Sequence, residues 1–223
     1  MLTGMKGIIF DLDGTMIDSM WMWRDIDLAF MGERNLPFTD DLERAIEGMS
    51  FRETAQYFIQ TYQLKETAEE LMQIWIEMAI HKYQYEVLPK PGLLAFLQEM
   101  KRRGIRMGIA TSNARTLLDA AANAHGLYDY MDAVLTANEV ARGKPAPDVF
   151  LAVSEKIGIP PAQCLVFEDI VQGIRAGLAA GMKVCAISDD YSVAQDEEKR
   201  ALAHYYIDSY TQVLDGSFEH LRT

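Results

Sequence analysis

The sequence predicts an α/β fold, a doubly wound parallel sheet that carries an inserted all-helical segment. Short apolar runs of strand length alternate with segments of helical periodicity over most of the 223 residues, which is typical of repeated βαβ units. One long stretch, from about residue 19 to residue 85, has helical periodicity alone. Apolar residues make up 49% of the chain, which is enough for a sizeable core.

The first expected strand covers residues 8–10 and leads into Asp11-Leu12-Asp13-Gly14-Thr15. Its apolar side chains, uninterrupted by polar groups, suit a strand that is covered on both faces. Two carboxylates at the tip of such a strand repel each other unless a cation offsets their charge. Their i, i+2 spacing points both the same way if the strand persists, and Gly14 supplies the freedom for a turn. A solvated strand end has the same residues, so a structural interpretation stays open here.

The long helical stretch shows apolar side chains at i, i+3, i+4 spacing in three places. These groups lie in residues 23–30, 42–46 and 71–78. Residues 39–41 and 50–53 resemble helix starts, the second with a Ser and a Glu at the spacing of a capping box. We therefore expect this stretch to be a helical insert without strands.

After residues 88–92, whose Leu-Pro-Lys-Pro-Gly sequence is typical of a hinge or linker, the α/β pattern returns. The expected strands are 106–111, 133–135, 164–167 and 184–187, and the expected helices are 93–103, 115–125, 148–156 and 171–180. Glycines at 104, 126 and 181 each follow a helical run, where a left-handed cap favours Gly. We expect an α/β domain from residues 1–16 and 88–223 and a helical domain over residues 17–87.

The composition excludes several classes of function. A formal net charge of -12 disfavours nucleic acid as a partner, so a phosphorylated substrate must be bound by local positive groups. Cys164 and Cys185 lie in apolar runs and are expected to be reduced core residues. We find no stretch of membrane-spanning length and no signal-peptide pattern, and we expect a cytoplasmic monomer or small oligomer without membrane contact.

In an open α/β sheet, functional sites form at the carboxyl ends of the strands. Residues 111–113 (Thr-Ser-Asn) end the second strand and offer a hydroxyl and turn amides to an oxyanion, although a helix cap has the same composition. Lys144 lies between Gly and Pro in a constrained loop, although a lone surface lysine usually has no role. Glu168 and Asp169 end a further strand, either as a second acid pair or as acids that suit a helix dipole.

Taken in order, these four motifs resemble the haloacid dehalogenase superfamily, in its phosphatase and β-phosphoglucomutase branch. The resemblance extends to Gly173, Ala176 and residues 179–181, and the helical stretch looks like the cap domain of that branch. It thus covers almost the whole chain and implies a Rossmann-like core, a helical cap and phosphoryl-transfer chemistry.

The resemblance implies a role for each motif residue. Asp11 would attack phosphorus to form an aspartyl phosphate, while Asp13 would protonate the leaving oxygen and then activate water. The implied cofactor is Mg²⁺, with Asp11, the backbone carbonyl of Asp13, Asp169 and, directly or through a water, Glu168 as ligands. Thr111 and Lys144 would offset charge on the transferred oxygens. The expected phosphate- and substrate-binding residues are Gly14, Thr15, Ser112, Asn113, Arg52, Trp21 and Trp23. Core packing is the alternative for the two tryptophans, and a solvated position is the alternative for Arg52.

We expect a magnesium-dependent phosphatase that acts on a small phosphorylated metabolite. Dehalogenases of the superfamily lack the acid at Asp13, and its phosphonate hydrolases need a cap lysine, which is absent between Lys6 and Lys65. The main alternative is a β-phosphoglucomutase-like sugar phosphomutase, because residues 48–52 resemble its substrate loop. Glu47 stands where such a mutase carries Lys, however, and residues 21–23 (Trp-Met-Trp) stand where it carries His. A receiver-like phosphorylation switch is the non-enzymatic alternative.

Overall fold

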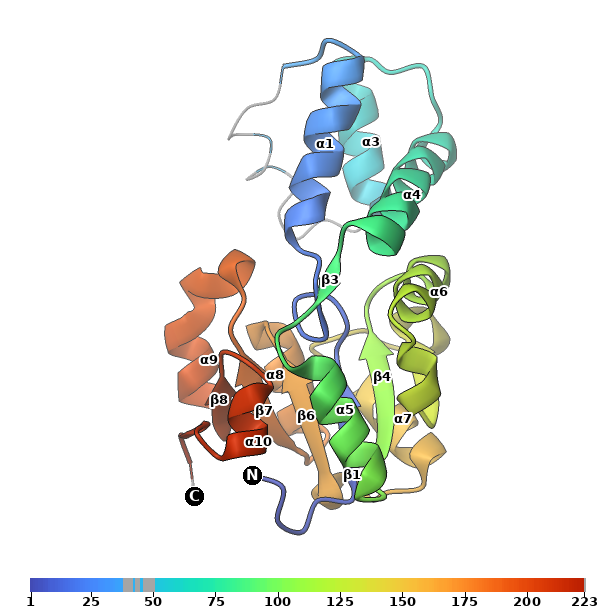
Figure 1. The fold of residues 1–223 in the computed structure, drawn as a ribbon. Coiled ribbons are helices and arrows are strands. Elements are labelled where there is room, and N and C mark those ends of the chain that lie inside the picture. The colour runs from blue at the N-terminus through green and yellow to red at the C-terminus, as the bar shows by residue number, and fades with distance from the viewer. Residues whose placement is uncertain (38–41, 43–44, 46–50, 223) are drawn as a thin grey trace.

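The computed structural model describes residues 1–37, 42, 45 and 51–222, and its centre is a seven-stranded sheet of order β5-β4-β1-β6-β7-β8-β9 (Figure 1). Its strands are β1 (Gly7–Phe10), β4 (Arg106–Thr111), β5 (Ala133–Thr136), β6 (Cys164–Glu168), β7 (Lys183–Ile187), β8 (Tyr205–Ile207) and β9 (Glu219–His220). Adjacent strands run parallel except for β8 and β9, which confirms the predicted fold class. Because β1 lies between β4 and β6, it carries the first acid pair to the middle of the carboxyl edge.

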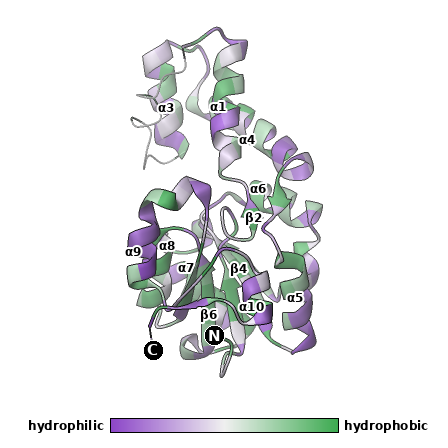
Figure 2. Cartoon of the chain, turned by 60° about the vertical axis from the view of Figure 1, so that its left-hand side comes forward, coloured by the Kyte–Doolittle hydropathy of each residue, from purple (hydrophilic) through white to green (hydrophobic). Residues whose placement is uncertain are grey.

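Helices cover both faces of the sheet, because successive strand residues point to opposite sides. Ile8 and Phe10 belong to the core that includes α5 (Leu93–Arg102) and α6 (Arg115–Ala124), whereas Ile9 belongs to the core that includes α7 (Asp148–Ile157) and α8 (Val171–Ala179). Figure 2 shows the apolar strands between helices whose outer surfaces are more hydrophilic. The last two helices are α9 (Asp196–Leu202) and α10 (Thr211–Asp215).

The inserted helices α1 (Trp21–Glu33), α3 (Phe51–Tyr62) and α4 (Ala68–Tyr85) lie together beyond the carboxyl edge of the sheet (Figure 1). Their shared core is aromatic: Trp75 packs edge-to-face on both Phe30 and Phe58, with ring centroids 5.7 and 5.0 Å apart. Thr67 and Glu70 form a capping box that fixes the start of α4. This helix also packs against α6, so the insert rests directly on the sheet domain.

The chain enters and leaves the insert through one short ribbon. Strand β2 (Ile17–Asp18) pairs antiparallel with β3 (Leu88–Pro89). The segment interpreted from sequence as a hinge or linker is therefore held in place, and the buried ammonium of Lys90 forms an ion pair with Asp189 at 2.7 Å. The β2–β3 pairing and this ion pair fix the segment that connects the insert to the sheet.

The other sequence-based expectations match the structure closely. The five expected strands all form, with Arg106–Thr111 at the predicted limits, and the described residues from 19 to 85 contain no strand. Glycines 104, 126 and 181 have φ between 63° and 75°, as a left-handed cap requires. Both cysteines are buried and free. Residues 39–41, which carry one expected helix start, and residues 48–50, which form most of the mutase-like loop, lie outside the described residues. Of the other expected helix start, residues 51–53 are described and begin α3.

Some elements escaped the sequence reasoning. These are β8, β9, α9, α10 and the β2–β3 ribbon. They are short, and strands of two or three residues carry no measurable periodicity. Within the part of the chain that the structure describes, no helix combines the length and apolar character needed to span a membrane.

Candidate active site

A pocket of about 270 Å³ lies at the carboxyl edge of the sheet. Residues from all four sequence motifs line it. Apolar side chains from α1, from the residue before α1 and from the residue before α8 complete the lining. The lining residues are Asp11, Asp13, Met20, Trp23, Thr111, Ser112, Asn113, Lys144, Asp169 and Ile170. The sheet brings the motifs together because β1, β4 and β6 are adjacent and parallel, so their ends meet at one edge.

A cluster of aromatic rings packs around the strand ends that carry the pocket residues. Phe10 stacks on Phe167 with ring centroids 5.4 Å apart, and Tyr210 packs against Phe167 at 5.2 Å. The Tyr210 hydroxyl donates to the carbonyl of Thr15 at 3.2 Å, and the amide of Asp11 donates to the carbonyl of Phe167 at 3.0 Å. The ends of β1 and β6 are thereby fixed relative to each other, and so are the carboxylates that follow them.

Lys144 is the cation at the centre of the site. Its ammonium donates to Asp11 Oδ1 at 2.5 Å and to Glu168 Oε1 at 2.6 Å, and its side chain is only 4% exposed. Burial acts to lower the pKa of Lys144, but the two neighbouring carboxylates outweigh it, and the pKa is raised. The lysine is therefore charged throughout the physiological pH range. Its burial and its two buried carboxylate partners distinguish it from a lone surface lysine in a loop.

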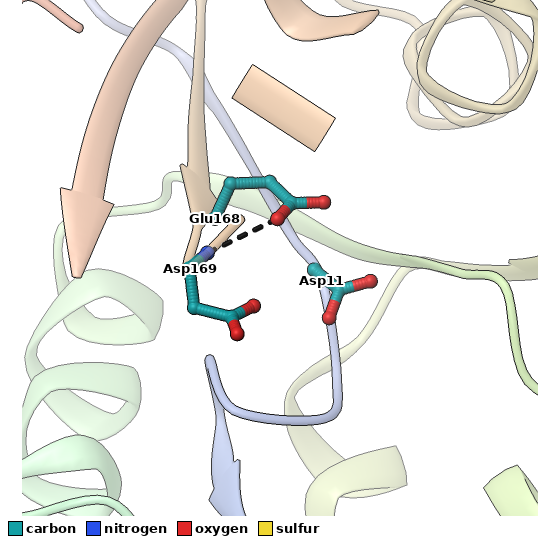
Figure 3. Close-up of side chains that lie close together, drawn as sticks. All are labelled: Asp11, Glu168 and Asp169. Carbon is teal, nitrogen blue, oxygen red and sulfur yellow. Dashed lines mark hydrogen bonds between the residues drawn. The ribbon is translucent and has the colours of Figure 1, made fainter. Parts of the chain in front are cut away.

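Three carboxylates converge beside this lysine. Each of Asp11, Glu168 and Asp169 offers an oxygen, and these oxygens all lie within 4.8 Å of one another. Figure 3 shows the carboxylate of Asp169 pointing toward Asp11, while Glu168 turns back so that its Oε2 accepts from the amide of Asp169 at 3.0 Å. All three residues are buried, so their repulsion is poorly screened by water.

The charge balance of this cluster fits a divalent cation. Burial, with the nearby carboxylates, raises the pKa of Asp11 to about 8, although Lys144 opposes the shift. Burial also raises the pKa of Asp169 well above its ordinary value, with Glu168 and Asp11 adding to the effect. Three acids thus face a single ammonium, and hard carboxylate oxygens are the ligands that Mg²⁺ prefers.

Gly14 and Thr15 lie against Asp169. Gly14 has φ of 74°, and a Cβ at this position would lie 2.3 Å from Asp169 Oδ2, so both the turn and the close approach favour glycine. The Thr15 hydroxyl donates to Asp169 Oδ1 at 2.9 Å. Neither residue is among those lining the pocket, and their predicted contact with substrate stays a prediction.

Asp13 is held by a separate set of donors. Strand β1 ends at Phe10, so a turn and not a continuing strand orients this side chain. Its Oδ1 accepts from Ser19 Oγ at 2.7 Å and from the Tyr83 hydroxyl at 2.5 Å, and its Oδ2 accepts from Asn113 Nδ2 at 2.9 Å. Asp11 and Asp13 therefore face one pocket but have different partners.

The turn after β4 contributes both side chains and rigidity. Thr111 is buried, and its hydroxyl oxygen accepts from the amide of Asn113 at 3.0 Å. Ser112 lines the pocket and is exposed. Asn113 fixes its own orientation, because its Oδ1 accepts from the amide of Ala114 at 2.8 Å. The turn thus lies directly before α6, whose N-cap is Ala114 without a side-chain cap, and forms part of the pocket wall.

The three substrate-binding residues expected in the insert have different positions. Trp23 lines the pocket and packs edge-to-face on Phe51. Trp21 does not line it; its indole donates to the carbonyl of Asp18 at 2.8 Å. Arg52 forms an exposed ion pair with Glu69 at 2.6 Å and is also absent from the pocket lining. The solvated alternative therefore describes Arg52 as the structure places it.

Sequence reasoning missed four residues of this site. Ser19 and Tyr83 hold Asp13, while Met20 and Ile170 complete the apolar part of the lining. Ser19 and Met20 lie within five residues of the motif at 11–15, so their nearness to it in the sequence could have indicated them. Tyr83 gave none, because a buried tyrosine on a helix usually belongs to the core.

Comparisons with known proteins show which sequences this chain resembles. The family model described as haloacid dehalogenase-like hydrolase matches residues 8–187. The chain is 33% identical to fructose-1-phosphate phosphatase YqaB of Escherichia coli, over 79% of this chain and 93% of that protein. It is 26% identical to phosphorylated carbohydrates phosphatase of Thermotoga maritima, over 80% of this chain and 83% of that protein.

Solved structures show the same fold. A putative β-phosphoglucomutase from Thermotoga maritima is 23% identical, with a TM-score of 0.79 over 96% of this chain and 98% of that one. The protein CbbY from Rhodobacter sphaeroides, solved in complex with phosphate, is 21% identical, with a TM-score of 0.79 over 94% of this chain and 96% of that one.

Proposed function

The chain belongs to the haloacid dehalogenase-like hydrolase family, and from this membership we propose that it is a phosphatase that hydrolyses a small phosphomonoester through a covalent intermediate on Asp11. One observation carries the proposal: Asp11, paired with a buried lysine, shares a single pocket with a second acid that the lysine does not bind. A nucleophile and a proton-transfer group are the two functions that the reaction requires.

The proposed reaction has two displacements. In the first, a carboxylate oxygen of Asp11 attacks phosphorus, the ester P–O bond breaks, and the leaving oxygen takes a proton from Asp13. In the second, water attacks the same phosphorus and gives a proton to Asp13, the bond to Asp11 breaks, and inorganic phosphate leaves. Lys144 and Thr111 line the same pocket, which supports a role for both in stabilising charge on the transferred oxygens.

We assign Mg²⁺ to the carboxylate cluster, held by Asp11 and Asp169, with Glu168 acting directly or through a water and with the main-chain carbonyl of Asp13. The bound ion supplies positive charge that lets an anionic nucleophile approach an anionic phosphate. The excess of buried carboxylates over ammonium groups supports this assignment. Thr15 orients Asp169 toward the cluster through its hydrogen bond.

We propose that residues 17–87 form a cap domain over a core domain of residues 1–16 and 88–223. The cap contributes Met20 and Trp23 to the pocket, and apolar side chains there exclude water from the reacting groups. A phosphorylated sugar or sugar alcohol is the proposed substrate class, supported by the names of the similar phosphatases, which include hexitol phosphatase A of Escherichia coli. We place the enzyme in the cytoplasm as a monomer or small oligomer, in line with its charge and composition.

A sugar phosphomutase is the second candidate, supported by the fold shared with a putative β-phosphoglucomutase. A mutase must bind a second phosphate. Among the described residues that line the pocket, Lys144 is the one cation, and two carboxylates already bind it. We therefore favour hydrolysis.

The test is a panel of hexose, hexitol and other monophosphates, incubated with Mg²⁺ and assayed for both inorganic phosphate and isomerised product. We expect phosphate release to dominate and Asp11→Asn to lose at least about a thousandfold in turnover. Turnover dominated by isomerisation refutes hydrolysis. Stoichiometric phosphorylation of the protein without turnover identifies a switch, and an active Asp11→Asn variant removes Asp11 as nucleophile.

A further inference from the structure

Tyr83 is a cap residue whose hydroxyl reaches the proposed proton-transfer group. It lies in the last turn of α4, and its side chain is fully buried. The phenol donates to Asp13 Oδ1 at 2.5 Å and accepts from Asn113 Nδ2 at 2.8 Å. Both hydrogen-bonding functions of the hydroxyl are thus used, and both partners lie outside the inserted helices.

Packing of the helix determines where this hydroxyl lies. Leu71, Trp75 and Ala79 are the other buried residues of α4 and form one stripe with Tyr83 at intervals of four residues. Through this helix the insert packs on α6, whose preceding turn contains Asn113. A shift of α4 relative to α6 therefore moves the phenol with respect to Asp13.

The Asp13 carboxylate has little other support from its own segment. Among the described residues, Ser19 is the one side-chain donor to it from the same loop, while Asn113 comes from the turn after β4 and Tyr83 from α4. Two of these three donors also bind each other. The orientation of Asp13 is consequently set by three separate parts of the chain, of which the cap helix is one.

We propose that Tyr83 is a positioning residue that fixes the orientation of the Asp13 carboxyl group, which in its protonated form gives a proton to the leaving oxygen and becomes the carboxylate, and that acid catalysis thereby depends on the seating of α4. This inference rests on the proposed phosphatase activity. It assigns the cap a role in the chemistry beyond covering the pocket. Substrate contact is not required of Tyr83, which is absent from the pocket lining.

Leaving-group dependence tests the proposal. A sugar alkoxide must be protonated as it leaves, whereas p-nitrophenolate leaves without a proton at neutral pH, and kcat/KM reports the step in which the ester bond breaks. We expect Tyr83→Phe to lower kcat/KM for the best sugar phosphate by about tenfold or more, and to change that for p-nitrophenyl phosphate by less than about twofold. The ratio of the two constants in one preparation is independent of the folded fraction, so partial misfolding does not affect the result.

Two further variants sharpen the test. Tyr85→Phe makes the same change two residues later on α4, where the side chain is 74% exposed, and is expected to leave both constants unchanged. In an Asp13→Asn background, Tyr83→Phe is expected to cause no further selective loss, because its effect passes through Asp13. Equal losses for both substrates, or no loss for either, overturn the inference while leaving the phosphatase intact. Absence of phosphate release by the unmodified protein refutes the proposed function instead.

Discussion

Gly173 offers a test of the site in which the sign of the effect is diagnostic. It is a buried residue of α8, and a Cβ built there would lie 1.7 Å from Glu168 Oε1 and 1.9 Å from Glu168 Cδ. Ordinary contacts are about twice as long, so Gly173→Ala must displace the Glu168 carboxylate. That carboxylate holds Lys144 at 2.6 Å and accepts from two backbone amides, and it has no exposed surface.

The magnitude follows from two opposing contributions. In an unobstructed helix, replacing Gly by Ala stabilises by about 0.5–1 kcal/mol. Breaking a buried ion pair costs about 3–5 kcal/mol, so the net destabilisation should be about 2–4 kcal/mol. For a chain of this length, that corresponds to a fall in Tm of about 4–16 °C. Displacement of Lys144 should also lower phosphatase turnover by about a hundredfold.

Thermal unfolding followed by circular dichroism, together with phosphate release, provides the measurement. The matched control is Gly32→Ala in α1, where a Cβ would have no neighbour within 4 Å among the residues that the structure describes, and which should raise Tm slightly. If Gly173→Ala instead keeps or raises Tm and retains full turnover, then Gly173 is an ordinary helix position and the space it leaves for Glu168 has no consequence.

Three other predictions follow. Because burial raises the pKa of Asp11 to about 8, above its unfolded value, the free energy of unfolding of the metal-free protein should fall as pH rises from about 4 to 8. For the same reason, the apparent affinity for Mg²⁺ should increase by up to about tenfold per pH unit between pH 6 and 8, as Asp11 loses its proton. Titration calorimetry that shows pH-independent affinity contradicts this. Lys90→Met, which leaves buried Asp189 without its ion pair, should destabilise by about 3–5 kcal/mol in urea unfolding, and a loss below about 1 kcal/mol makes the pair unimportant. Trp23→Ala should raise KM for a sugar phosphate by about threefold to tenfold, whereas Trp21→Ala, outside the pocket lining, should leave KM within about twofold; the reverse order excludes the pocket role of Trp23.

The sequence predicted the sheet well because its strands are buried on both faces. Residues 106–111 form an apolar run bounded by charged and polar residues, and β4 has those limits. At the other extreme, β8 has three residues, and β9 forms only by pairing with it. Such strands depend on neighbours that are distant in sequence, so local pattern contains little information about them.

Within the site, too, local pattern predicted the residues at the strand ends better than those placed by contacts between distant segments. Asp11, Lys144 and Asp169 were found from sequence because strand ends of a parallel sheet converge whatever the details of packing. Of the donors to Asp13, Asn113 was among the expected site residues, whereas Tyr83 was not, because its position depends on how α4 packs against α6. Arg52 stays a prediction: its place beside a loop motif suggests a binding role, and in the structure its side chain forms an exposed ion pair with Glu69.

The β2–β3 ribbon has an evolutionary consequence. Since Ile17 pairs with Pro89 and Asp18 with Leu88, the chain departs from the sheet and returns to it at a single point. The entropy of closing a loop grows only slowly with its length, so segments of different size can occupy this point without changing the strand order. Selection can therefore exchange or remodel the insert to reach new substrates while the carboxylates and the lysine at the sheet edge are inherited unchanged.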